Sequence, residues 1–425
     1  MQQFEKAIKS ESGVTIYSYK NPAVHSFYIS LFVKAGVMYE NADEYGITHF
    51  FEHTAIRNVN KLYGLNLYSN LDRFGLEFNA STFSEMVQFY VSGASSNFSK
   101  GAEIITKILN PVILDKSEIE SERKRIKAEI RESDEKTSLA SFTNKIVFEG
   151  TSLSASIVGC NKTIDKISKS KLEEYRKKIL TKENMFFYVT GNFDDSDIQS
   201  LCMEIEKFDI CSSEERKNIA PVPNGFLKRG ESVHVKNADF SMVRFTFDID
   251  MSRYSIAETD LIYDLLLSGY NSKLFVEMSE KRGLFYDING ALERYENIGT
   301  IYFSYEVKEK DVYDSIAIAV DVLNQIKAGN ISESECMKAG YVDNAYMLYD
   351  DSRELNFTFA YDNHIMGEKY LSVDERKNRY ENITANRISE VATEIFRLEN
   401  LTLTMKGKVK KTDKEKINKI LRRLS

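Results

Sequence analysis

Residues 49–53 of this 425-residue chain read His-Phe-Phe-Glu-His, with a glutamate directly before the second of two histidines four positions apart. At about 100° per residue, His49, Glu52 and His53 share one side of a helix. The opposite side, which is expected to anchor the helix, carries Ile47, Phe50, Phe51 and Thr54. The histidines are therefore predicted to face outward. Two imidazoles and a carboxylate on one helical turn can hold a metal ion and a catalytic base, which points to metal-assisted hydrolysis.

A solvated polar face on an amphipathic helix shows the same pattern, so the interpretation depends on a third metal ligand. A second helix is predicted at 115–136, because this stretch is rich in helix-forming residues. Its narrow apolar stripe consists of Ile119, Ile126 and Ile130. Glu122 and Glu129 are seven positions apart and border this stripe, so either can reach a buried site. A purely solubilising charge pattern is the alternative, and composition alone does not select the ligand.

The bulk composition is that of a folded globular protein, with 42% hydrophobic and 28% charged residues. The net charge of −7 provides no basic surface for nucleic acid, and the basic run at 406–423 is predicted to be a solvated helix. No stretch approaches the roughly 20 apolar residues of a membrane span, and the first ten residues are too charged for a secretory signal. A cytoplasmic protein is expected. The four cysteines lack C-x-x-C spacing, which argues against disulfides and a cysteine zinc site.

The clearest internal boundary lies at 211–230, where two of the four prolines occur. Proline fixes φ and removes a hydrogen-bond donor, so this stretch is predicted to be an extended linker at 213–229. It separates an N-terminal domain, 1–212, from a C-terminal domain, 230–425. The length of the chain is consistent with two domains.

The two halves repeat the same order of predicted elements. Each begins with an alternating strand, continues with an amphipathic helix and then has a further strand. In order, the first half has 26–34, 45–56 and 77–92, and the second half has 240–249, 257–267 and 299–307. This repeat predicts two related α+β domains.

The stretch 46–53, followed by Glu122 and Glu129, closely resembles the inverted zinc-peptidase signature of the pitrilysin and mitochondrial processing peptidase family. The likeness continues through the first half at 33–36, 75–82, 110–111, Gly159, 184–185 and Gly191. It extends more loosely into the second half. The resemblance implies two α/β-roll domains, each an antiparallel-rich sheet packed with helices, that together form half of a clamshell.

By this resemblance, His49, His53 and Glu129 would be zinc ligands, Glu122 would support the site and Glu52 would be the general base. These roles are also chemically consistent without the resemblance, because three protein ligands leave the fourth position of a zinc ion open for a water molecule. Zinc lowers the pKa of such a water to about 7, and Glu52 can take its proton. Glu122 would orient a ligand histidine through its free ring nitrogen.

In this family the strand after the zinc helix is an edge that accepts substrate as an added strand. The matching segment is 78–81, so Asn79 and Ala80 are predicted to bind substrate through backbone pairing. An ordinary turn and strand is the alternative for these two residues.

The second half contains a similar Gly-Leu-x-Tyr element at 283–286, so Tyr286 would bind the substrate carbonyl or the developing oxyanion. The family arginine expected seven residues earlier is Ser279 here, which is the main departure. Arg282 is nearby and is a candidate for the same role, with a surface arginine as the alternative.

These observations predict a zinc-dependent endopeptidase that cleaves short or extended peptides in a chamber between two half-shells, as a homodimer or with a related subunit. A first alternative is the catalytic subunit of a heterodimer that matures a small ribosomal peptide, with the partner supplying the arginine missing at Ser279. A second is a non-catalytic scaffold, which the intact zinc signature argues against. A third is a metal-binding or peptide-carrier protein, which would bind zinc without turnover.

Overall fold

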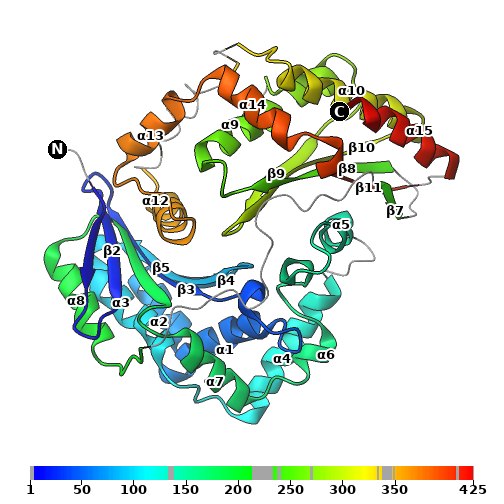
Figure 1. Cartoon of the computed structure of the whole chain (residues 1–425). Helices are drawn as coiled ribbons and strands as arrows, with labels where there is room; N and C mark the ends of the chain where they lie inside the picture. Colours follow the sequence, from blue (N-terminus) through cyan, green and yellow to red (C-terminus); the bar gives the residue numbers. More distant parts are fainter. Residues whose placement is uncertain are drawn as a thin grey trace. The chain divides into compact units, whose positions relative to one another are not determined.

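The computed structural model describes residues 4–132, 138–212, 233–236, 241–268, 271–332, 335–336, 347, 350–407 and 411–424. The described chain forms two compact units, each built on one sheet (Figure 1). The predicted linker at 213–229 lies outside the described residues. No helix within the described ranges is both long and apolar enough to cross a membrane.

The first unit contains a six-stranded sheet in the order β1-β2-β6-β3-β5-β4. Its strands are β1 (Lys6–Lys9), β2 (Thr15–Lys20), β3 (Ser26–Lys34), β4 (Glu77–Thr82), β5 (Met86–Ala94) and β6 (Met185–Gly191). Its helices are α1 (Ile47–Leu62), α2 (Leu67–Phe74), α3 (Phe98–Thr106), α4 (Lys116–Glu132), α6 (Asn161–Ile164), α7 (Lys169–Ile179), α8 (Asp195–Ile205), α12 (Ser352–Phe359) and the π-helix η7 (Ala360–Ile365).

The two faces of this sheet are covered differently. Apolar side chains of β3 and β5 pack with α1, α3 and α7 into one continuous core on the first face. The helix α12 lies against the other face (Figure 1), where Asn356 accepts a 2.7 Å hydrogen bond from Ser30 and donates a 2.9 Å bond to the carbonyl of Tyr188. These bonds satisfy buried polar groups on this face of the sheet.

The second unit contains a five-stranded sheet in the order β7-β11-β8-β10-β9. Its strands are β7 (Val233–Lys236), β8 (Ser241–Asp250), β9 (Ile288–Arg294), β10 (Ile298–Val307) and β11 (Leu401–Lys406). Its helices are α5 (Leu139–Val147), α9 (Ile256–Leu267), the π-helix η5 (Phe275–Glu280), α10 (Val312–Lys327), α13 (Val373–Glu381), α14 (Ala385–Ile395) and α15 (Lys411–Leu421).

The units are not contiguous along the chain. The helix α5 lies in the first half of the sequence but belongs to the second unit, where Thr143 bonds Thr404 of β11 at 2.6 Å. Conversely, α12 and η7 lie in the second half but belong to the first unit. The predicted domains, 1–212 and 230–425, did not include this exchange of helices.

The predicted elements are largely present. The strand β3 has the predicted bounds, β10 and α9 each begin one residue before the predicted start, and β8 is shifted by one residue at both ends. The single strand predicted at 77–92 is wrong, because β4 and β5 form a hairpin closed by a 2.8 Å bond from the Phe83 amide to the Met86 carbonyl. The helix α1 continues to Leu62, six residues beyond the predicted end, because Ala55 and Val59 extend its buried side. The α+β fold class is confirmed.

Candidate metal centre

The start of α1 is fixed by a buried carboxylate and by close backbone packing. Glu40 is 1% exposed and accepts bonds from the amides of Gly46 at 2.8 Å and Thr48 at 2.9 Å. These two amides lie at the start of the helix, where backbone N–H groups have no hydrogen-bond acceptor within the helix itself. Gly46 has φ 94°, and a Cβ there would lie 2.8 Å from the Cα of Gly159. The helix therefore begins at one defined place.

The predicted buried side of α1 is confirmed, since Ile47, Phe50, Phe51 and Thr54 are all at most 1% exposed. The prediction that the histidines face outward is wrong for His49, which is only 9% exposed. The helix α4 packs along this side of α1 and covers it, as its own stripe residues Ile119 and Ile126 are buried.

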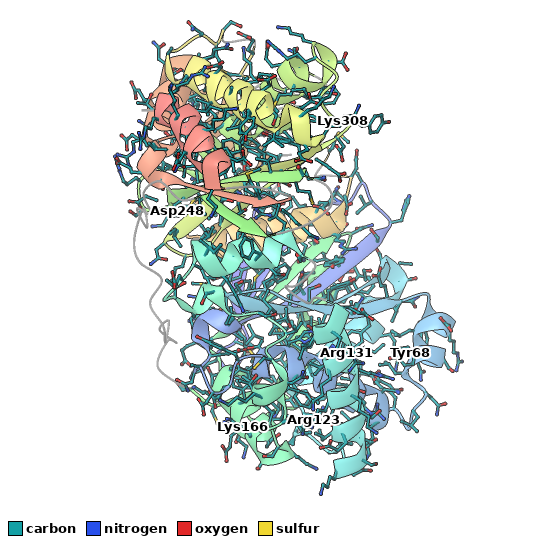
Figure 2. The ribbon with its side chains drawn as sticks, turned by 90° about the vertical axis from the view of Figure 1, so that its right-hand side faces the viewer. Tyr68, Arg123, Arg131, Lys166, Asp248 and Lys308 are labelled. Atoms are coloured by element: carbon teal, nitrogen blue, oxygen red, sulfur yellow. The ribbon has the colours of Figure 1, made fainter. Side chains whose placement is uncertain are left out.

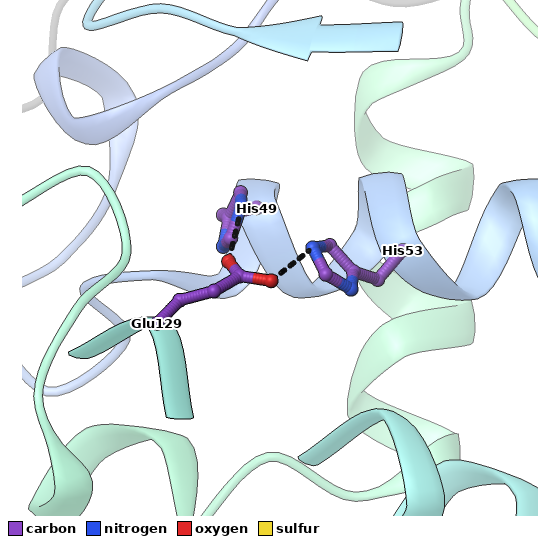
Figure 3. Close-up of side chains that lie close together, drawn as sticks. All are labelled: His49, His53 and Glu129. Carbon is purple, nitrogen blue, oxygen red and sulfur yellow. Dashed lines mark ion pairs between the residues drawn. The ribbon is translucent and has the colours of Figure 1, made fainter. Parts of the chain in front are cut away.

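Glu129 of α4 brings a carboxylate, the third candidate ligand, to the two histidines (Figure 3). Its two oxygens lie 3.4 Å from Nε2 of His49 and 3.5 Å from Nε2 of His53. One ligand atom from each residue lies within 4.8 Å of the other two. In a tetrahedral zinc site with bonds of about 2.0–2.1 Å, neighbouring ligand atoms are roughly 3.4 Å apart. The three side chains therefore fit a zinc-sized cation.

The pKa values of the two histidines are shifted in opposite directions. Burial, and secondarily the neighbouring His53, lowers the pKa of His49 to about 4, so its imidazole is neutral at physiological pH. A neutral imidazole is the form that coordinates a metal. Burial also lowers the pKa of His53, but the hydrogen bond to Glu122 and the nearby carboxylates outweigh it and raise the pKa. The Nδ1 atom of His49 is buried and has no hydrogen-bond partner among the described residues.

Glu122 lies behind His53 and is held by two arginines. Its carboxylate is 3.4 Å from Nδ1 of His53, 2.5 Å from Arg57 and 3.2 Å from Arg125. Burial alone would raise the pKa of Glu122, but His53, Arg57 and Arg125 lower it overall. Because Glu122 contacts Nδ1 of His53, the Nε2 atom of the same ring faces Glu129. Carboxylates commonly orient metal-binding histidines in this way, through the ring nitrogen that does not bind the metal.

Glu52 lies one turn along α1 and does not join the three converging side chains. Thr82, at the end of β4, donates a 2.5 Å hydrogen bond to its carboxylate. Burial is the main reason that the pKa of Glu52 is raised, with the Thr82 bond opposing it. A raised pKa suits a carboxylate that accepts and returns a proton.

The strand β4 is the edge of the first sheet and packs beside α1. Asn79 is exposed, and its side-chain oxygen accepts a 2.9 Å bond from the amide of Ala80. The predicted edge position of this segment is confirmed, while its binding of substrate stays a prediction.

A cavity of about 420 Å³ lies next to Glu52 and His53. Its other lining residues are Ile56, Arg57, Asn60, Leu65, Tyr68, Asn79, Glu122 and Arg125. Leu65 has φ 67° and is the single non-glycine residue with positive φ in the described part of the chain. This conformation costs a side chain of this type about 1–3 kcal/mol.

The two remaining predicted residues belong to the second unit. Tyr286 is 97% exposed, and Arg282 forms a 2.8 Å ion pair with Glu277. Ser279, which replaces the family arginine, donates a 2.8 Å bond to the carbonyl of Phe285 and so closes the turn that leads to Tyr286. The roles of Tyr286 and Arg282 stay predictions.

Sequence reasoning missed four residues that hold this site, namely Glu40, Arg57, Thr82 and Arg125. Arg57 is four positions after His53, so it lies one turn further on the same side of α1, which was a usable signal. Arg125 follows Glu122 by three positions on α4, so this pair was a usable signal too. Glu40 and Thr82 come from a separate loop and strand, and their contacts with α1 depend on packing between elements rather than on local spacing.

Comparisons with known proteins agree with this fold. A family model described as "Insulinase (Peptidase family M16)" matches residues 15–161, and one described as "Peptidase M16 inactive domain" matches 166–339. A Rickettsia bellii protein named "Uncharacterized zinc protease" is 28% identical over 407 residues, covering 91% of this chain and 94% of that protein.

Solved structures show the same fold at low identity. A protease from Helicobacter pylori superposes with a TM-score of 0.81 at 15% identity, covering 96% of this chain and 100% of that chain. The periplasmic protease PqqL from Escherichia coli gives 0.80 at 15% identity, covering 98% of this chain and 50% of that chain. The fold is that of the peptidase half-chains. The protein belongs to peptidase family M16, the family of pitrilysin.

Proposed function

We propose that this chain is a zinc-dependent endopeptidase whose reaction takes place at His49, Glu52, His53 and Glu129. The observation that carries the proposal is the convergence of two imidazoles and one carboxylate at 3.4–3.5 Å, with the separate, partly buried carboxylate of Glu52 directly before His53 on the same helix. The family membership and the zinc-protease names of relatives support the same assignment.

His49, His53 and Glu129 would hold the metal, and Glu122 would fix His53. A zinc ion there would lower the pKa of a water molecule to about 7 and polarise the scissile carbonyl. Glu52 takes the proton from the attacking water and passes it to the departing amine. The bond from Thr82 holds the Glu52 carboxylate in one orientation while it does so.

Substrate is proposed to pair with the edge of β4 at Asn79 and Ala80. The bond from the Ala80 amide to Asn79 occupies a donor that an added strand would use, so substrate would displace this side chain. Backbone pairing requires an extended substrate and reads little sequence, which favours short or unfolded peptides.

A second copy or a related subunit is proposed to complete the enzyme. Two features favour this: Ser279 supplies no positive charge, and Tyr286 is 97% exposed in the single chain. The alignment with one half of the longer PqqL chain is consistent with a half-size protein that pairs. If the partner is a different subunit that contributes the arginine, the chain is the catalytic half of a heterodimer.

The test is turnover of a mixed library of quenched fluorescent peptides by the zinc-loaded chain and by Glu52→Gln. Removal of a general base typically costs about 10²–10⁴-fold in rate, and Glu52→Gln should lose that much while keeping its zinc. Glu258→Gln, on α9 of the second unit, is the matched control, because glutamine also completes its capping box. Equal turnover by wild type and Glu52→Gln would contradict the proposal.

A further inference from the structure

A cavity of about 590 Å³ lies in the first unit, away from the candidate metal centre. It is formed where the end of β1, the starts of β2 and β6 and the π-helix η7 meet. The sheet order places β1 and β2 at the edge opposite β4, which packs beside α1. The helix α4, along which Figure 2 shows Arg123 and Arg131, also packs on α1. The cavity has the size of a small-molecule site and shares no lining residue with the cavity beside Glu52.

Strand register brings the lining side chains to one face of the sheet. Lys9 is paired with Thr15, and Thr15 is paired with Phe186. Paired residues and residues two positions apart point to the same face, so Tyr17 joins this group. Tyr17 stacks on His364 of η7, with ring centroids 3.6 Å apart. The cavity therefore lies on the face of the sheet that η7 covers, opposite the face that packs against α1.

Tyr17, Phe186 and His364 form an aromatic wall on one side of the cavity. Phe186 meets Tyr17 edge-on, with centroids 5.5 Å apart, and lies 5.4 Å from the ring of His364. Glu5 fixes the imidazole, because its carboxylate lies 3.0 Å from Nε2 of His364 and also accepts a 2.5 Å bond from Tyr188. Glu5 itself does not line the cavity. The wall is thus a fixed aromatic surface that can contact a planar ring.

The cavity is also basic. Its lining contains three lysines, Lys9, Lys34 and Lys182, and one acidic residue, Glu183. The net charge of the lining is therefore about +2 at neutral pH. Within the described part of the chain, neither Lys9 nor Lys182 forms an ion pair. The stem of Lys182 packs over Gly13, where a Cβ would lie 3.1 Å from the Cδ atom of the lysine. Ammonium groups from separate elements that line one cavity favour an anionic ligand.

We propose that this cavity binds a small molecule that carries a phosphate group on a planar aromatic ring. Lys9, Lys34 and Lys182 pair with the phosphate, and the wall of Tyr17 and Phe186 contacts the ring. A phosphate monoester has a charge of about −1.5 to −2 at pH 7 and three acceptor oxygens, which matches both the net charge and the three ammonium groups. A carboxylate would neutralise only half of this charge. The site is independent of the proposed peptidase reaction, because the two share no residue.

The test is isothermal titration calorimetry of the full chain with phenyl phosphate, inorganic phosphate and phenol. Phenyl phosphate should bind about 5-fold or more tightly than inorganic phosphate, because only its ring contacts the aromatic wall. It should bind about 10-fold or more tightly than phenol, which lacks the charge. A chelator should leave these affinities unchanged. Binding that disappears with the chelator would belong to a metal ion and would overturn the proposal.

The double variant Lys9→Met with Lys182→Met keeps the apolar stems and should weaken phenyl phosphate binding by about 10-fold or more. Lys6→Met is the matched control. It removes one lysine charge from the same strand, but its position three residues before Lys9 places it on the other face of the sheet. This control should change the affinity by less than about 2-fold, because exposed charges at a distance are largely screened by salt.

Phe186→Leu tests the aromatic wall separately. It should bring the affinity for phenyl phosphate close to that for inorganic phosphate, whose own affinity should stay the same. The proposal is overturned if wild type does not bind phenyl phosphate, if it binds inorganic phosphate equally well, or if the double lysine variant binds as tightly as Lys6→Met. None of these outcomes bears on peptide hydrolysis, so the proposed function is tested independently.

Discussion

The two units share one strand arrangement but differ in what their helices carry. In the first, β2 and β6 are parallel, and β3, β5 and β4 continue the sheet with antiparallel pairs. In the second, β7 and β11 are parallel, and β8, β10 and β9 continue in the same way. The fold is therefore repeated almost strand for strand.

The helix that follows the central strand is where the units diverge. In the first unit α1 carries His49, Glu52 and His53, whereas α9 in the second contains no histidine and buries residues on most of its sides. The later helix differs too, since α4 supplies Glu122 and Glu129, while α10 contains no glutamate. The comparison teaches that the sheet and its apolar helices specify the fold, and that a few polar side chains on two helices determine the chemistry.

The largest expected effect concerns the loss of stability on acidification that the buried His49 gives to α1, since α9 contains no histidine. Because the pKa of His49 is lowered to about 4, the unfolded chain binds a proton near pH 6.5 that the metal-free folded chain does not. Stability from this group is thus present above pH 6.5 and lost as the pH falls toward 4, by roughly 3 kcal/mol in total.

Urea unfolding of the metal-free wild type and of His49→Gln at several pH values measures this effect. The variant should lose less stability than wild type on acidification through that window. Identical pH profiles would show that His49 is not protected from protonation in the folded state, and the contrast between α1 and α9 would weaken.

A second prediction tests whether Arg57 supports the metal site through Glu122. Arg57→Met keeps the apolar stem but removes the 2.5 Å contact with the carboxylate. Loss of a group that orients a metal ligand typically weakens metal affinity by about 10–100-fold, and that range is expected here. Zinc titration against a competing chelator measures it, with Arg387→Met, which breaks the pairing with Glu258 in the second unit, as control. Unchanged zinc affinity in Arg57→Met would contradict this role.

The smallest expected effect concerns the N-terminal ends of α9 and α1, which are held in place by different contacts. Ser255 caps α9 by accepting the Glu258 amide, so Ser255→Ala should cost about 1 kcal/mol of stability and leave zinc binding intact. Gly46→Ala should cost more and should also disturb zinc binding, because its new Cβ would lie 2.8 Å from Gly159. Denaturant titrations and zinc content distinguish the two. Equal losses in both variants would contradict the idea that the start of α1 is fixed more tightly.

Much of the fold could be predicted from the sequence, because segments such as β3 and α9 are rich in apolar residues and have the lengths expected for a strand and a helix. The exchange of α5 and α12 could not, because nothing local in a short helix indicates which sheet it covers. At the site, the spacing of His49 and His53 was sufficient to suggest a metal. The choice of Glu129 over Glu122 depended on the family resemblance, and Thr82 became visible only when the end of β4 was placed beside Glu52.

We propose that the first unit holds a zinc site built from His49, His53 and Glu129. The most direct measurement is a zinc titration of the metal-free chain, followed by the same titration of Glu129→Gln and of the second-unit control Glu258→Gln. We expect one zinc per chain in wild type and control, and an affinity weakened by about 100-fold or more in Glu129→Gln. Zinc bound equally well by Glu129→Gln, or not bound by wild type at all, would contradict it.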